Sequence, residues 1–372
     1  MNRVPNRHRK GTIAVPAPGA AVRRRMIRSM IVLAALAALA MMLPRAARGQ
    51  SQVNKVGTSA ANFLQLELGG RAVAMGGAYV GLSDDISALY WNPAGAAFLE
   101  GLRVGYTNVE RYAGIRHQFS GVIVPLPGLG ALGVSVVHVD CGEMEITTIE
   151  RPEGTGQTFT ASDLALGLSF AGRLTDRVSF GITARYIQEK IWLESASGYA
   201  LDMGTLYRLP DRGLRIGMAI TNFGPEMGID NGPHLTFEKE PPDNYPSSPP
   251  LESRLETKRF PLPVKFELGV ALDAVGTNSM LLSSSTSRVT LAGTINDGFD
   301  APFRSAWGVE YEWGGLIALR GGYRENYDTG GLSAGAGIDV PVRAGLGVRF
   351  DYAWVDYGDL DSIQLWSLEL TF

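Results

Sequence analysis

The sequence predicts an all-β protein: a closed antiparallel transmembrane β-barrel of about 14 strands, with a short helical N-terminal plug inside the lumen. Three observations support this prediction. From residue 102 onward, short segments alternate apolar with polar or small side chains at period two. Outside the N-terminal leader, no run is long and apolar enough for a transmembrane helix. Tight turns and longer connections alternate along the chain, as in membrane barrels.

The first 49 residues have the organisation of a signal peptide. Arginines at 23–25 and 28 precede an apolar run over 30–43, and Ala47-Arg48-Gly49 is a small-x-small site that would release Gln50. This run is shorter than the about 20 apolar residues that a membrane anchor needs. We therefore expect residues 1–49 to direct export and then to be removed.

Removal of this leader changes the charge of the chain. Residues 1–49 carry 10 of the 34 Lys and Arg and none of the 37 Asp and Glu, so 24 basic residues face 37 acidic ones, a net charge of -13. Because phosphate affinity needs clustered cations, we expect no nucleic-acid partner. The one cysteine excludes an internal disulfide and a thiolate zinc cluster, and we expect neither cofactor nor metal.

Residues 50–101 do not alternate and are predicted to form the plug. Ser83 or Asp84 can cap a short helix that runs through Tyr90, because their side-chain oxygens accept free backbone amides. Pro93 can begin a second short helix through Ala97. Glycines in this segment permit close approach of its backbone to a wall. A compact element of this size fits the lumen of a barrel of about fourteen strands.

Residues 102–372 are predicted to form the barrel, with strands of about the 9–11 residues needed to cross a bilayer. The expected strands are 102–110, 115–126, 129–139, 161–173, 177–189, 197–208, 213–222, 262–273, 286–296, 302–313, 315–324, 331–341, 343–355 and 361–372.

The two longest connections, 140–160 and 223–261, are expected at the outer face. The Pro- and Ser-rich composition of 223–261 fits either a solvated surface loop or a partner-binding lid. The connection 274–285 is long and Ser-rich where a short turn is expected, which leaves the register of its neighbouring strands open.

Charges of both signs occupy the predicted lumenal faces of the strands. They are Arg185, Arg215, Lys265, Glu267, Glu310, Glu312, Arg320, Arg324, Arg349 and Asp351. A conduit for fatty acids would need an apolar pocket instead. We therefore expect these charges to pair with one another and with a fixed plug, and any ligand site to lie near the outer mouth.

Six residues of the plug are candidate ligand or plug contacts: Arg71, Asp84, Asp85, Trp91, Asn92 and Pro93. For Asp84 and Asp85 three roles stay open, namely helix capping, a salt bridge to a lumenal arginine, and contact with a ligand or ion.

The end of the sequence alternates strictly, with Trp366, Leu368, Leu370 and Phe372 on one face. This pattern resembles the assembly signal of bacterial outer-membrane β-barrels. The resemblance implies the barrel assembly machinery and outer-membrane lipid as partners. It also implies the outer membrane of a Gram-negative-type bacterium as the location.

We expect no catalytic residues. Residues 128–133 match G-x-G-x-x-G by spacing, but a period-two strand follows them where dinucleotide binding needs a helix N-terminus. The histidines at 117, 138 and 234 are not at metal-ligand spacing. An outer-membrane lipase-type enzyme, with a Ser and a His brought together from separate strands, stays as an alternative.

The plug carries a long motif. It consists of Gly70-Arg71-Ala72, Ala74-Met75-Gly76-Gly77-Ala78, Asp84-Asp85 and Ala88-Leu89-Tyr90-Trp91-Asn92-Pro93-Ala94-Gly95. This motif resembles the N-terminal signature of the PorV/PorQ family in the superfamily of FadL-type transporters. In FadL-type proteins the region matching Asn92-Pro93-Ala94 belongs to a hatch, and hydrophobic ligands leave sideways into the membrane. In PorV-type proteins the barrel takes part in type IX secretion and receives cargo at its outer face.

Two main functions follow from this resemblance. The first is a non-enzymatic barrel for type IX secretion or surface attachment, whose partners would be secretion-system proteins and secreted cargo. The alternative is a FadL-like transporter of hydrophobic small molecules across the outer membrane. It would require a continuous apolar pocket from the loops to the plug and a gap in the barrel wall.

Overall fold

The structure is a computed structural model that describes residues 57–239, 251–327, 329–343 and 345–372. By its internal contacts the chain divides into residues 1–52 and 53–372, and only the second unit contains described residues. The predicted signal peptide, residues 1–49, lies outside them.

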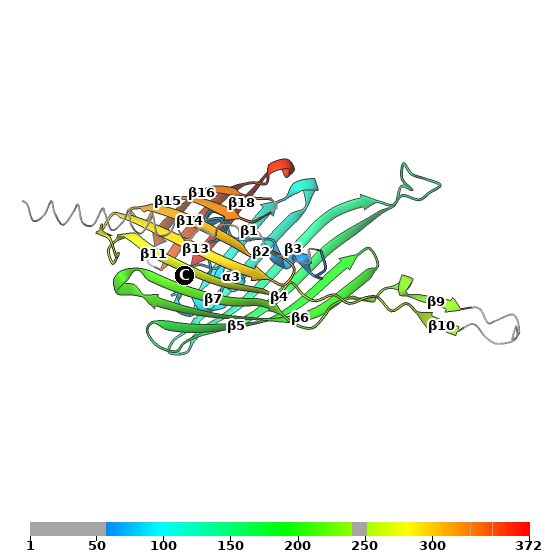
Figure 1. The fold of residues 1–372 in the computed structure, drawn as a ribbon, viewed down its shortest axis with the longest axis horizontal. Helices are drawn as coiled ribbons and strands as arrows, with labels where there is room; N and C mark the ends of the chain where they lie inside the picture. Colours follow the sequence, from blue (N-terminus) through cyan, green and yellow to red (C-terminus); the bar gives the residue numbers. More distant parts are fainter. Residues whose placement is uncertain (1–56, 240–250, 328, 344) are drawn as a thin grey trace, which may run out of the picture. The chain divides into compact units, whose positions relative to one another are not determined.

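Fourteen antiparallel strands form a closed barrel (Figure 1). They are β1 Arg103–Glu110, β2 Arg116–Leu126, β3 Gly130–Glu145, β4 Thr158–Arg173, β5 Val178–Ile191, β6 Glu194–Leu209, β7 Leu214–Phe223, β11 Lys265–Gly276, β13 Ser287–Gly298, β14 Arg304–Trp313, β15 Ile317–Glu325, β16 Leu332–Arg343, β17 Leu346–Asp356 and β18 Ser362–Thr371. Pairing of β18 with β1 and of β7 with β11 closes the sheet. Each of the fourteen predicted segments overlaps one of these strands, so the predicted barrel is confirmed.

The connections divide between two ends of the barrel. The short-turn end carries 127–129, 174–177, 210–213, 314–316 and 344–345. It also carries 277–286, where the two-residue strand β12 (Leu282–Ser283) pairs in parallel with β11. The register that the sequence left open runs regularly from Lys265↔Gly298 to Asp273↔Thr290 and then shifts at a bulge.

The long-loop end carries 146–157 and 224–264. Strands β3 and β4 pair as far as Glu145 and Thr158, so the first of these connections is shorter than its predicted span. The second contains β8 (Ile229–Asn231), which pairs with β6, and a separate hairpin of β9 (Thr236–Lys239) and β10 (Leu251–Arg254). Figure 1 shows this hairpin beyond the ends of the barrel strands.

Alternation along each strand sends apolar side chains outward. On β17, Phe350 and Tyr352 are exposed, whereas Asp351 and Ala353, which alternate with them, are buried. A surface of exposed apolar side chains around a closed sheet suits a hydrocarbon environment. Among the described residues, none of the helices is both long and apolar enough to cross a membrane.

Residues 57–101, called here the N-terminal segment, form four short helices: η1 Asn62–Gln65, α2 Gly70–Ala74, α3 Ala88–Trp91 and η2 Pro93–Phe98. Nearly all residues from Leu68 to Ala97 are buried. They bury apolar side chains together with inward-facing residues of the barrel wall in one cluster.

The starts of these helices test the predicted caps. Neither Ser83 nor Asp84 caps a helix, so that expectation is wrong. Ser83 has a positive φ of 39°, and α3 begins only at Ala88, where Asp85 Oδ1 accepts the Ser87 N–H at 2.9 Å. Helix η2 begins at Pro93 as predicted, and the Asn92 side chain accepts the Ala94 N–H at 3.2 Å.

Candidate functional site: the contact between the N-terminal segment and the barrel wall

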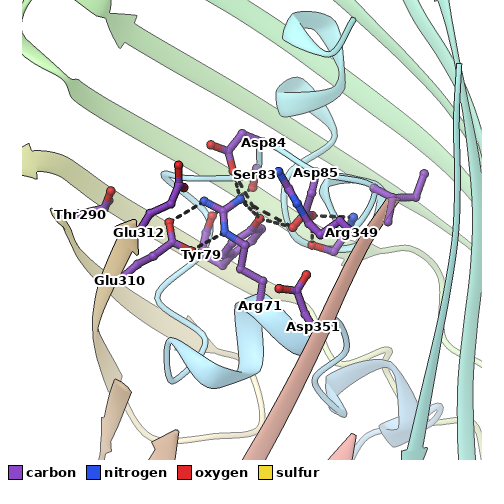
Figure 2. Close-up of polar contacts among 12 residues, drawn as sticks. Arg71, Tyr79, Ser83, Asp84, Asp85, Thr290, Glu310, Glu312, Arg349 and Asp351 are labelled. Atoms are coloured by element: carbon purple, nitrogen blue, oxygen red, sulfur yellow. Dashed lines mark hydrogen bonds and ion pairs between the residues drawn. The ribbon is translucent and has the colours of Figure 1, made fainter. Parts of the chain in front are cut away.

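Arg71 of α2 is the central charge of this contact, and its side chain is only 5% exposed. Its Nε and Nη2 donate to the two carboxylate oxygens of Glu310 on β14, at 2.8 and 2.9 Å. Its Nη1 donates to Asp84 Oδ1 at 2.5 Å and to Tyr79 Oη at 3.2 Å (Figure 2). The two-point pairing with Glu310 fixes both position and orientation of the guanidinium group.

The adjacent carboxylates extend this network along the segment. Asp84 Oδ2 accepts from Arg215 Nη1 on β7 at 3.1 Å. Burial alone would raise the pKa of the Asp84 carboxyl, but the charges of Arg71 and Arg215 outweigh burial and hold that pKa well below its usual range. Asp84 is therefore an anion that joins the segment to β7, the salt-bridge role among the three left open by the sequence.

Tyr79 connects the same network to Asp85. Burial raises the pKa of the Tyr79 hydroxyl well above its usual range, against the opposing charge of Arg71. The hydroxyl therefore stays protonated and donates to Asp85 Oδ2 at 2.5 Å. Sequence reasoning did not single out Tyr79, because an aromatic side chain in an apolar run carries no signal of a polar contact.

The wall continues the network from strand to strand. Glu310, 1% exposed, also accepts from Arg320 Nε on β15 at 2.7 Å. Arg320 Nη1 donates to Asp351 on β17 at 2.6 Å, and Arg288 Nη2 donates to Glu312 at 2.7 Å. Buried charges persist only when they are paired, so this chain of pairs allows charged side chains inside the barrel.

Of the other predicted lumenal charges, Arg324 of β15 donates through Nε to Gly76 O of the segment at 3.2 Å, and the rest pair within the wall. Arg185 of β5 pairs with Asp202 of β6, and both are buried. Arg349 donates to Asp339 Oδ2 through Nη2 at 2.6 Å. Lys265 and Glu267 of β11 pair at 3.1 Å, and the Lys265 ammonium lies 5.6 Å from the centre of the Trp91 ring.

Trp91, Asn92 and Pro93 form the turn that meets β5 and β6. Trp91 Nε1 donates to Leu68 O at 2.9 Å, within the segment. Asn92 Nδ2 donates to Val80 O at 3.0 Å and to Thr205 O of β6 at 3.1 Å. The Asn92 side chain therefore joins two parts of the segment and the wall.

The wall meets the segment chiefly through glycine. Ten inward-facing glycines, called here the glycine seats, lie on ten different strands: Gly105, Gly121, Gly133, Gly181, Gly204, Gly217, Gly269, Gly308, Gly322 and Gly335. A Cβ at Gly217 would lie 2.2 Å from Val80 O, and one at Gly322 would lie 2.1 Å from Gly76 N. The sequence shows small side chains on the polar faces of the strands, but it does not show that these glycines mark contacts with the segment.

The wall also supplies hydrogen-bond partners that sequence reasoning missed. Gly70 N–H donates to Ser367 Oγ at 2.7 Å, and Ile86 N–H donates to a Glu369 carboxylate oxygen at 2.8 Å. Ser179 Oγ donates to Ala94 O at 2.7 Å. All three wall residues alternate with apolar outward neighbours, and that alternation was the available signal.

The predicted assembly-signal residues lie at the closing seam. Trp366 packs between Tyr106 and Phe350, at ring-centre distances of 5.4 and 6.5 Å. Leu368 and Leu370 pair with residues of β1 and β17, and Phe372 exchanges backbone hydrogen bonds of 2.8 and 3.1 Å with Leu102. A role of these residues in assembly stays a prediction.

The sequence profile of a family described as "Type IX secretion system protein PorV" matches residues 49–242, more than half of the chain. The chain belongs to the PorV family. This match confirms the resemblance predicted from the N-terminal motif. It covers the N-terminal segment and the first seven barrel strands of this PorV-family protein. A search of curated protein sequences found no match.

Solved structures share the fold of this PorV-family barrel. One is described as the CymD monoaromatic hydrocarbon channel, with a TM-score of 0.54 and 12% identity over 82% of this chain and 98% of that chain. Another is the P. putida toluene transporter TodX, with a TM-score of 0.51 and 11% identity over 81% of this chain and 97% of that chain. The family and the barrel fold support an outer-membrane location, and none of these descriptions names an enzyme.

Proposed function

We propose that this PorV-family barrel is a non-enzymatic component of type IX secretion or of surface attachment. In this proposal the N-terminal segment is a fixed plug and the long-loop end binds partner proteins. The observation that carries the proposal is the seating of the segment. Arg71 and Asp84 are tied to Glu310 and Arg215 of the wall, and the backbone of the segment rests on the glycine seats. A lumen filled in this way suits a scaffold better than a conduit.

The long-loop end offers a surface for such partners. On and beside the β9–β10 hairpin, Phe237, Leu251 and Leu255 are 46%, 67% and 55% exposed. Large apolar side chains gathered on a projecting hairpin are typical of protein interaction sites. We therefore place partner binding on this hairpin, with the long-loop end facing outward.

Affinity purification tests this proposal. The full-length protein would be isolated from native outer membranes in mild detergent, and co-purifying proteins would be identified by mass spectrometry. We expect secretion-system proteins, or cargo proteins that share a common C-terminal domain. Replacement of 236–254 by a Gly-Ser linker should abolish their recovery. The same replacement of 147–156 should leave it unchanged.

Recovery of the same partners by both linker variants would contradict the placement of binding on the hairpin. Bound lipid or hydrocarbon without any protein partner would contradict the secretion role and favour transport.

A FadL-like transporter of hydrophobic molecules is the second candidate, and one observation favours it. Towards the long-loop end, Val137, Val139 and Ile187 of the wall are buried in one cluster with Phe63 and Leu64 of the segment. Departure of residues near Phe63 would expose an apolar pocket. Uptake of labelled toluene by cells that carry the protein, above cells that lack it, would support this candidate.

A further inference from the structure

A hollow of about 300 Å³ lies in the inner wall, between the N-terminal segment and the short-turn end of the barrel. Four neighbouring strands, β16, β17, β18 and β1, line it. At the ends of these strands Pro341 and Gly345 are exposed, so in an outer-membrane barrel the hollow opens towards the periplasm. Two rows of inward-facing residues form its walls: Asp339, Arg349 and Glu369 nearer the segment, and Pro341, Gly347, Thr371 and Arg103 nearer the strand ends.

Gly347 of β17 gives this hollow its depth, and it differs from the glycine seats in what lies next to it. At Gly105, the seat on β1, an added Cβ would lie 2.5 Å from Ile86 Cγ2 of the segment. At Gly347 the nearest atom to an added Cβ would be Thr371 Cβ of the wall, at 3.8 Å. The segment therefore fills the space next to Gly105 but does not reach the space next to Gly347.

The two arginines of the hollow keep unused hydrogen-bond donors. Arg349 Nε and Nη2 both donate to Asp339 Oδ2, at 3.0 and 2.6 Å, whereas its buried Nη1 has no hydrogen-bond partner among the described residues. Arg103 donates through Nε to Glu100 O at 3.3 Å and through Nη1 to Glu369, which leaves its Nη2 unused within the same part of the chain. Glu369 cannot serve these donors, because its second oxygen accepts the Ile86 N–H. A buried donor without an acceptor is costly, so the hollow suits a ligand that supplies acceptor oxygens.

We propose that this hollow binds the carboxylate group of a small periplasmic molecule, with its oxygens at Arg349 Nη1 and Arg103 Nη2. A guanidinium group matches a carboxylate in shape and charge. The charged residues that line the hollow are these two arginines with Asp339 and Glu369, so their charges sum to zero. A carboxylate adds one negative charge to this balanced set, whereas a phosphate group adds up to two. Leu346 and Pro341 complete the lining and would contact the uncharged part of the ligand.

Isothermal titration calorimetry of the full barrel in detergent micelles tests the proposal. The ligands are N-acetyl-alanyl-alanine, its C-terminal amide, butyrate and inorganic phosphate. The wild type should bind the acetylated dipeptide but not its amide. Gly347→Leu fills the hollow and should raise the Kd about tenfold or more. Arg349→Lys keeps a positive charge beside Asp339 but lacks the unused Nη1 donors, and it should also raise the Kd about tenfold.

Gly321→Leu is the matched control, because Gly321 is an outward-facing glycine of β15, where the nearest atom to an added Cβ is 3.9 Å away. It should bind the dipeptide as the wild type does. Butyrate bound as tightly as the dipeptide would assign the site to free short acids, and tighter binding of the dipeptide would assign it to chain ends.

Equal affinity of the two leucine variants, equal affinity for the dipeptide and its amide, or no binding by the wild type would overturn the proposal. Tighter binding of phosphate than of either carboxylate would overturn the choice of ligand. The slower gel mobility of heated protein confirms that each variant has folded as a barrel.

Discussion

At the scale of single residues, the absence of a side chain decides where the wall and the N-terminal segment meet. Gly322 of β15 faces the lumen, and a Cβ there would lie 2.1 Å from Gly76 N and 2.4 Å from Met75 C. Neighbouring Gly321 faces outward, where the nearest atom to an added Cβ is 3.9 Å away. An added side chain would therefore clash with the segment at Gly322 but would meet open space at Gly321.

Gly322→Ala should therefore loosen the segment, whereas Gly321→Ala should not. Overpacking against backbone atoms typically costs about 1–3 kcal/mol. We expect faster amide hydrogen exchange over residues 70–82 in Gly322→Ala, measured by mass spectrometry on the detergent-solubilised barrel. Equal exchange in both alanine variants would show that the glycine seats do not hold the segment.

At the scale of elements, the N-terminal segment is held by charge as well as by shape. Asp84 has a pKa well below its usual range because of Arg71 and Arg215. A carboxyl whose pKa is depressed in the folded state contributes stability above its unfolded pKa, about 4, and loses that contribution as pH falls. Acid should therefore weaken the attachment of this element.

Lowering the pH from about 4 to about 2, a range in which pepsin is active throughout, should increase cleavage of the segment by this protease. Asp84→Asn should be cleaved more readily at every pH and should lose part of this pH dependence. Asp359→Asn, an exposed aspartate of the 357–361 connection, is the control and should behave as the wild type. A pH profile that is identical in wild type and Asp84→Asn would refute the role of this carboxylate.

The elements also show what the sequence can and cannot predict. The fourteen strands were predictable, because period two and turn residues are local signals. The start of α3 was not, because Asp85 rather than Ser83 or Asp84 accepts the free amide. The contacts of the site were not predictable either, since Asp84 and its partner Arg215 are 131 positions apart in the chain. They come together only when the strands have paired in their native register and the sheet has closed into a barrel.

At the scale of the whole molecule, the inner wall of the barrel carries paired charges and contacts the segment. Arg71, Arg215, Arg288 and Arg320 are each paired with at least one carboxylate. Ions that enter such a lumen would meet these paired charges and the backbone of the segment packed against the glycine seats. The lumen should therefore be impermeable to ions.

We expect the wild type to show almost no ion conductance in planar lipid bilayers. Arg71→Ala combined with Asp84→Ala should produce frequent openings, because Glu310 and Arg215 of the wall would each lose the charged partner that ties them to the segment. Arg116→Ala is the control, since Arg116 belongs to a largely exposed pair at the long-loop end. Steady conductance of the wild type would contradict a fixed plug.

The hydrogen bonds that seat the segment have a consequence for the order of folding. Gly70 bonds to Ser367 across 297 positions, and Ile86 bonds to Glu369 across 283. The segment leaves the ribosome first, yet its partners on β18 leave last, so no early intermediate of the nascent chain can contain the finished seat. Contacts of such long sequence separation form slowly. The seat of the segment can therefore be completed only once β18 is in place beside β1.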